Sequence, residues 1–221
     1  VVCGFALPFI ERKFSVSSFQ SSRAPIDHNP LKDRLSIWLQ RWSIDTRALD
    51  NAWLARVNAC TFAPDDLLVR AGDSSDTLYL LETGLVRLFY LTPEGKERNK
   101  AFFTAGDVTG PVSAAITGSV APFSIQALEP VTALSFHYAD LVAAAAQDTR
   151  WCELQLQLLG GAFIRNEQRE AMLLTCNAQQ RYAWLLDNEP ELLDRVPQFH
   201  IASYLGVDAV SLSRLKRKIT D

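Results

Sequence analysis

The sequence predicts an α+β fold with three parts: an antiparallel β-roll, a long connecting helix and a C-terminal helix-turn-helix. Three observations predict it. Short apolar segments alternate with turn residues over residues 60–136, which is typical of an antiparallel roll or barrel. Apolar residues then recur at helical spacing over residues 150–174. Finally, residues 201–219 contain two helical patterns around a glycine.

These patterns divide the chain into four segments. We expect a leader of unknown status at 1–30, a sensor-like roll with flanking helices at 31–147, a long helix at 148–175 and a helix-turn-helix domain at 176–221. The first ten residues are apolar, but Glu11, Arg12 and Lys13 follow them instead of preceding them, which is the wrong order for a secretory signal. We assign no function to the leader.

Composition is that of an ordinary globular chain. Of the 221 residues, 48% are hydrophobic and 21% are charged, and the net charge is −3. This charge excludes a protein covered in basic residues, but it allows one local basic face. No apolar run is long enough to span a bilayer, so we expect no membrane partner and a cytoplasmic location.

Cysteines and histidines are too scattered to indicate a metal centre. Cys3, Cys60, Cys152 and Cys176 show no C-x-x-C spacing, which disfavours a zinc ribbon or an iron–sulfur cluster. Residues 60–136 contain no histidine, so an imidazole metal site of the cupin type cannot be built there. No other catalytic constellation stands out, and we expect neither a cofactor nor an enzyme.

The segments before and within the roll are predicted from their spacing. Residues 31–57 are expected to be helical with a break near Ser43, and their tryptophans are interpreted as packing anchors. Turn residues, mainly Gly, Pro and Asp, then separate the expected strands. These are residues 67–70, 78–81, 85–91, 98–103, 123–127 and 131–136, with a hairpin connection at 92–96 in which Pro93 takes the second turn position.

A short helix and then a long one are expected after the roll. Residues 140–147 are rich in alanine, and Asp148 or Thr149 can cap a helix that starts at Arg150. Its expected apolar stripe is formed by Trp151, Leu154, Leu158, Leu159, Ala162 and Phe163. This helix is interpreted as a dimer seam. The alternative is a helix packed on its own roll, and the Gly160-Gly161 pair weakens a strict coiled coil.

The C-terminal segment carries the strongest local signal. Residues 177–187 are predicted to be a helix with Tyr182, Leu185 and Leu186 inward, and 191–195 a short turn or helix. Gly206 then supplies the turn between two helices, and Asp208 caps the second one. Its apolar face is Leu212, Leu215 and Ile219. Its opposite face is basic, which suits either a nucleic-acid surface or a plain solvated face.

Several segments in the correct order resemble the bacterial catabolite-activator/FNR family of transcription regulators. The likeness covers roughly residues 35–219. It is carried by the G-D and G-x-V pattern of 70–88, by 102–110, by 181–186 with 190–198, and by 201–207. The resemblance implies a cyclic-nucleotide-binding-like roll (a double-stranded β-helix), a homodimer, and binding to double-stranded DNA. RNA polymerase is a further partner of this kind of protein.

The expected effector pocket departs from the family pattern. Cyclic-nucleotide-binding members present a Gly-Glu-Leu turn and an Arg-Ser pair, whereas this chain has Gly110-Pro111-Val112 and Ala121-Pro122 followed by Phe123. From 101 to 128 the only charged residue is Asp107, so the pocket residues do not support a cyclic nucleotide. A small apolar effector, or plain core, are the alternatives for Val112, Ala114, Ile116, Val120 and Phe123.

The expected DNA contacts lie on the last helix and its cap. They are Asp208, Ala209, Val210, Ser211, Ser213, Arg214, Lys216, Arg217 and Lys218. Arg214 matches a base-reading position of the family, and we expect a bidentate guanine contact. The residues from 216 to 218 are expected to bind phosphate. The chain lacks the β-wing that usually follows, so the helix-turn-helix is expected without a complete wing.

The sequence therefore favours a sequence-specific DNA-binding regulator with an effector-sensing roll. The alternative is a ligand-binding or protein-interaction module of the same fold that has lost DNA binding, which the Ala209-Val210 pair and the missing wing would explain.

Overall fold

The structure is a computed structural model that describes residues 30–40, 44 and 51–220. The expected leader and the expected break near Ser43 lie outside these residues. Two helices, α1 (Pro30–Leu39) and α2 (Asn51–Leu54), precede the roll. The remaining helices are α3 (Val112–Thr117), α4 (Tyr138–Ala145), α5 (Thr149–Thr175), α6 (Ala178–Asn188), α7 (Leu192–Arg195), α8 (Gln198–Leu205) and α9 (Ala209–Thr220).

The roll consists of two four-stranded antiparallel sheets. One has the order β1-β8-β3-β6 and the other β2-β7-β4-β5. The strands are β1 (Asn58–Phe62), β2 (Leu67–Val69), β3 (Thr77–Thr83), β4 (Leu85–Leu91), β5 (Glu97–Thr104), β6 (Val108–Thr109), β7 (Ser124–Ala127) and β8 (Val131–His137). The antiparallel roll predicted from the short apolar segments is confirmed.

The β4–β5 hairpin is closed by the expected turn. The amide of Thr92 donates to the carbonyl of Lys96 over 2.9 Å, and the amide of Gly95 donates to the carbonyl of Thr92 over 2.9 Å. Pro93 therefore occupies the second position of the turn, where its fixed φ is favourable.

One β-bulge in β5 changes the direction of its side chains. Leu88 pairs with Ala101 and Phe89 pairs with Asn99, which leaves Lys100 without a partner opposite. A bulge interrupts the strict alternation of a strand. As a result, Asn99 faces the C-terminal helices, as Phe102 does, although the two residues are three positions apart in the strand.

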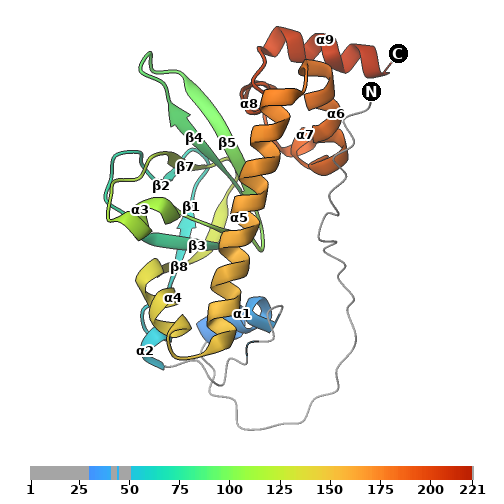
Figure 1. The fold of residues 1–221 in the computed structure, drawn as a ribbon. Coiled ribbons are helices and arrows are strands. Elements are labelled where there is room, and N and C mark those ends of the chain that lie inside the picture. Colours follow the sequence, from blue (N-terminus) through green and yellow to red (C-terminus); the bar gives the residue numbers. More distant parts are fainter. Residues whose placement is uncertain (1–29, 41–43, 45–50, 221) are drawn as a thin grey trace, which may run out of the picture.

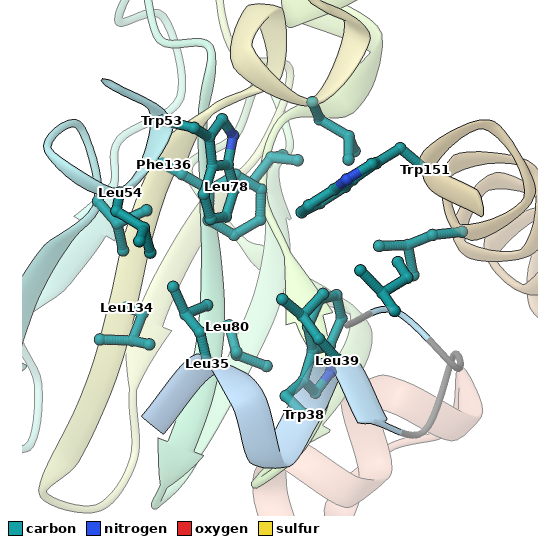
Figure 2. Close-up of a cluster of buried hydrophobic side chains, with 14 residues drawn as sticks. Leu35, Trp38, Leu39, Trp53, Leu54, Leu78, Leu80, Leu134, Phe136 and Trp151 are labelled. Atoms are coloured by element: carbon teal, nitrogen blue, oxygen red, sulfur yellow. The ribbon is translucent and has the colours of Figure 1, made fainter. Parts of the chain in front are cut away.

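A large apolar cluster joins the N-terminal helices, the roll and the start of α5 (Figure 2). The Trp53 ring lies 5.9 Å from the ring of Phe136 and 5.2 Å from that of Trp151, measured between centroids. Trp38 is 7% exposed and belongs to the same cluster. The tryptophans described here are thus packing anchors, as predicted.

The long helix α5 runs along the roll and ends at the C-terminal helices (Figure 1). Its cap is Asp148, whose side chain accepts the amide hydrogen of Arg150 over 2.9 Å. Trp151 and Leu154 are buried, but Phe163 is 62% exposed. The predicted apolar stripe therefore packs on the roll at its start and is exposed at Phe163, and its use as a dimer seam stays a prediction.

Four helices, α6 to α9, form a C-terminal unit that packs against the roll. Asn177 caps α6 in a capping box with Gln180. Tyr182 and Leu185 are buried, in one cluster with Leu85 and Phe102 of the roll. Among the described residues, no helix combines the length and the apolar character that crossing a bilayer requires.

Candidate functional site

The turn between α8 and α9 has the geometry of a helix-turn-helix. Gly206 adopts a φ of 67°, and its amide closes α8 on the carbonyls of Ala202 and Ser203. A Cβ at this position would lie 3.0 Å from Nη1 of Arg181. Glycine is therefore required here both by the backbone conformation and by the close approach of the guanidinium.

Arg181 stands behind this turn and binds three backbone carbonyls. Its Nε donates to Cys176 over 2.9 Å, its Nη2 to Leu173 over 2.8 Å and its Nη1 to Leu205 over 3.0 Å. The first two carbonyls belong to the end of α5 and the third to the end of α8. One side chain thus joins the end of the long helix to the helix-turn-helix.

Asp208 caps α9, as the sequence predicted. Its Oδ1 accepts the amide hydrogen of Ser211 over 2.8 Å, and its Oδ2 accepts the Ser211 hydroxyl over 2.7 Å. These bonds, the backbone one first, hold the pKa of Asp208 below its ordinary value. Both residues were expected to contact DNA. In this arrangement their polar atoms satisfy each other, so a contact of the Ser211 hydroxyl with a base would require breaking this bond.

The other predicted contacts of α9 separate into two faces. Leu212 is 1% exposed and Leu215 is partly buried, which defines the inner face. Val210, Arg214 and Arg217 are exposed and follow one another at spacings of four and three residues, so they form one stripe. Ala209 is also exposed, whereas Ser213 and Lys216 are partly buried. The side chains of Lys218 and Ile219 lie outside the described residues.

A buried polar cluster fixes the helix-turn-helix to the roll. Arg87 of β4 is 4% exposed. Its guanidinium donates to Oε1 of Gln126 (2.8 Å) and Oδ1 of Asn99 (3.1 Å), pairs with the Glu97 carboxylate (2.6 Å), and lies 3.3 Å from Nδ1 of His200. Asn99 in turn donates to the carbonyl of His200 over 2.9 Å. The bulge in β5 makes these contacts possible because it directs Asn99 toward α8.

Further polar contacts extend this cluster along α8. The amide of Asn99 donates to Oγ of Ser203 over 3.0 Å. Arg169 of α5 donates to the carbonyls of Asn99 and Tyr204, each over 2.8 Å. Burial, with a smaller contribution from Arg87, lowers the pKa of His200 to about 4, so its ring is neutral at pH 7. We call Arg87, Asn99, Arg169, His200 and Ser203 the interdomain cluster.

Sequence reasoning missed the interdomain cluster. The one available signal was Arg87, a charged residue in the otherwise apolar strand Leu85–Leu91. Its partner His200 lies 113 positions away in the sequence. No local pattern connects two positions that far apart.

A cavity of about 460 Å³, here called the roll cavity, lies between the roll, α3, α4 and α5. Of the predicted pocket residues, Gly110, Val112 and Phe123 line it. Pro111 and Ala121 are buried outside the lining and Pro122 is exposed.

The residues that the sequence suggested for contact with a small apolar effector also differ in position: some line the cavity and others do not. Ile116 lines the cavity at 56% exposure, Ala114 is buried, and Val120 is 55% exposed outside the lining. The alternative reading as plain core is therefore wrong for Ile116 and Val120. Gly110 is required by packing, since a Cβ there would lie 2.7 Å from the carbonyl oxygen of Thr77.

The positive charges of the roll cavity come from outside residues 101–128, the segment that the sequence analysis searched. Three charged residues line it: Lys100 from β5, Asp107, and Arg165 from α5. The Lys100 ammonium lies 4.8 Å from the ring centroid of Phe123, and the Arg165 guanidinium lies 4.4 Å from that of Phe103. Lys100 precedes the searched segment by one residue, and Arg165 is reached only through the packing of the long helix.

Fold and sites together define a class of protein: a sensor-like β-roll joined by one long helix to a helix-turn-helix. The family model of the cyclic nucleotide-binding domain matches residues 59–148. The chain is 27% identical over 159 residues to the fumarate and nitrate reduction regulatory protein of Vibrio cholerae, covering 67% of this chain and 63% of that protein. It is 28% identical over 163 residues to the anaerobic regulatory protein of Haemophilus influenzae, covering 67% and 62%.

Solved structures show the same fold. FixK2 from Bradyrhizobium japonicum superposes with a TM-score of 0.66 at 20% identity, covering 74% of this chain and 84% of that one. A CooA mutant from Carboxydothermus hydrogenoformans gives a TM-score of 0.64 at 18% identity, covering 83% and 84%. The chain is thus similar in sequence to regulators of the catabolite-activator/FNR type, and it has the fold of these solved structures. Its match spans about 63% of the length of the first of these curated relatives.

Proposed function

We propose that the protein is a dimeric, sequence-specific DNA-binding transcription regulator whose roll senses an effector. The observation that carries this proposal is the exposed stripe of Val210, Arg214 and Arg217 on the second helix of a helix-turn-helix. That helix is held by Leu212 on its inner face, so the stripe is presented on a fixed surface. Such a helix fits the major groove of B-form DNA.

The roles of the stripe residues differ by chemistry. Arg214 reads a base, since a guanidinium can donate two hydrogen bonds to guanine O6 and N7. Arg217 and Lys216 bind phosphates, which adds affinity and register without sequence information. Val210 lies four residues before Arg214 and provides an apolar contact for a thymine methyl group.

Dimerisation through α5 is part of the proposal. Four large apolar side chains of this helix are exposed, and the three most exposed are Leu156 (70%), Phe163 (62%) and Leu174 (76%). Their separations of seven and eleven residues keep them on one face of a helix. A second copy of the chain would cover this face, and twofold symmetry would place two half-sites about one helical turn of DNA apart.

Effector control follows from the position of α5. This helix lines the roll cavity through Leu158, Ala162 and Arg165, and it holds the helix-turn-helix through Arg169. An effector in the cavity would therefore contact the same helix that positions α9. It can shift the arrangement only by its difference in affinity for two arrangements. In this role the protein acts in the cytoplasm, with double-stranded DNA and RNA polymerase as partners, and we assign it no catalytic step.

The test is selection of bound sequences from a randomised duplex library. We expect enrichment of a twofold-symmetric motif. Arg214→Ala should lose preference at one base pair per half-site, at a cost of about 1–3 kcal/mol. Arg217→Ala should weaken binding to all sequences alike and reduce the salt dependence by about one phosphate contact. Arg70→Ala, an exposed arginine of the roll, is the matched control and should change neither.

Two outcomes would contradict the DNA-binding role. An unchanged sequence preference in Arg214→Ala would show that Arg214 does not contact a base. No enrichment with wild-type protein would instead favour a ligand-binding or protein-interaction module that does not bind DNA.

The dimer is tested separately by sedimentation. Leu156→Glu should yield a monomer, because a charge would be buried at the seam without a partner. Ile37→Glu on α1 is the control, since this side chain is equally exposed at 70% but lies on another helix. An unchanged dimer in Leu156→Glu would show that α5 does not form the dimer seam.

A further inference from the structure

The β-bulge in β5 gives the roll cavity a lysine that has no acidic partner within the part of the chain that the structure describes. Lys100 is the bulged residue, and bulges commonly redirect a side chain next to a functional site. Its ammonium lies over the ring of Phe123 at 4.8 Å and more distantly over that of Tyr90 at 5.8 Å. Among the described residues, no carboxylate forms an ion pair with it.

The surroundings of this lysine are positively charged. Burial, then the charges of Arg165 and Arg169, lower the pKa of Lys100. Arg165 also lines the cavity. The only acid in the lining is Asp107, and its Oδ2 already accepts the amide hydrogen of Thr104 over 2.9 Å. Arg165 and Arg169 also interact with the buried carboxylate of Glu189, so the cation that an anion in the cavity would offset is Lys100.

The rest of the lining is mainly apolar and partly aromatic. Leu88, Phe103 and Phe123 come from the roll, and Leu158 and Ala162 come from α5. A volume of about 460 Å³ is within the range of small-molecule sites. Aromatic rings favour offset or edge contacts with a second ring, so the lining suits an aromatic body.

One polar group of the lining is left unsatisfied. Thr109 is 3% exposed, and its hydroxyl has no hydrogen-bond partner among the described residues. Buried hydroxyls are normally bonded, and an unpaired one needs an explanation. Rotation about χ1 would exchange the hydroxyl and the methyl group, so a polar atom of a ligand could satisfy it.

We propose that the roll cavity binds an aromatic carboxylate whose carboxylate group pairs with Lys100. A cyclic nucleotide fits these residues less well. The turn Gly110-Pro111-Val112 offers no carboxylate to a ribose, and Ala121-Pro122 offers no donor side chain to a phosphate. The role of this ligand as an effector rests on the proposed function, but its binding does not.

Calorimetry on the full-length protein without DNA tests the proposal with 1-naphthaleneacetate and its neutral analogue 1-naphthaleneacetamide. We expect the carboxylate to bind and the amide to bind about 10- to 100-fold more weakly, because a charge-assisted hydrogen bond is lost. Lys100→Met should abolish this preference, and Lys100→Arg should restore it. Lys96→Met, which removes an exposed charge of the neighbouring turn, should leave binding unchanged.

Three results would overturn the proposal: equal binding of acid and amide, unchanged binding in Lys100→Met, or no binding of the carboxylate at millimolar concentration. Cyclic AMP serves as the competing probe, and its tight binding with the same affinity in Lys100→Met would also overturn it. The outcome is separable from the proposed function. Carboxylate binding that leaves DNA binding unaltered would support the site while removing its role in regulation.

Discussion

The two ends of α5 are held to the roll in different ways. Near its start, Trp151 packs against Trp53 in a cluster of apolar side chains (Figure 2). Near its end, Arg169 joins β5 and α8 through two hydrogen bonds to backbone carbonyls. Apolar contact is non-directional and scales with area, whereas hydrogen bonds require one geometry. The first junction therefore supplies stability, and the second specifies one orientation of the helix-turn-helix.

The largest expected effect lies at the apolar junction. Trp151→Ala should lower the free energy of unfolding by about 3–5 kcal/mol, because it leaves a cavity between α5, α2 and β8. Urea denaturation measures this loss. Glu153→Ala, an exposed change two residues away, is the control and should stay within about 0.5 kcal/mol of wild type. A loss as small as that of the control would contradict the assignment of stability to this junction.

An intermediate effect is expected at the polar junction. Arg87→Met keeps the length of the side chain but leaves Asn99 and Gln126 without their donor, at a cost of about 1–3 kcal/mol. Native-state hydrogen exchange should show faster exchange in α8 while the strands of the roll stay protected. The exposed neighbour Arg98 provides the control, as Arg98→Met. Unchanged protection of α8 would show that the interdomain cluster does not hold the helix-turn-helix.

The smallest effect is a dependence on pH. Because the pKa of His200 is about 4 in the folded protein and about 6.5 when unfolded, the unfolded state binds more protons between these values. Stability should therefore fall on acidification, by roughly 1 kcal/mol between pH 7 and 5.5. The nearby acids Glu97 and Asp65 reduce the shift without reversing it. His200→Gln should flatten this slope, and the exposed His137→Gln should retain it; equal slopes in both variants would exclude His200 as the source.

Local patterns predicted much of the fold. The strand Leu85–Leu91 was predicted at the residues where the structure has it, and the cap at Asp148 was one of two predicted alternatives, the other being Thr149. Both depend on neighbours within a few positions: a continuous apolar run in one case and a carboxylate before a helical period in the other. The turn at Gly206 was predicted for the same reason.

The candidate sites were less predictable because they depend on long-range contacts. The period-2 pattern of β5 fails at Lys100, since a bulge is set by the pairing with β4 and not by the strand itself. The cations of the roll cavity come from β5 and α5, and only packing brings them together. Arg87 and His200 likewise meet only once the C-terminal unit lies against the roll.

Arg181 has a mechanical consequence. It fastens the carbonyls of Leu173 and Cys176 to that of Leu205, so the last turn of α5 and the turn before α9 behave as one solid piece. A tilt of the last turn of α5 would therefore be passed through Arg181 to the turn before α9. The orientation of the end of α5 therefore also determines the angle at which α9 faces its binding partner.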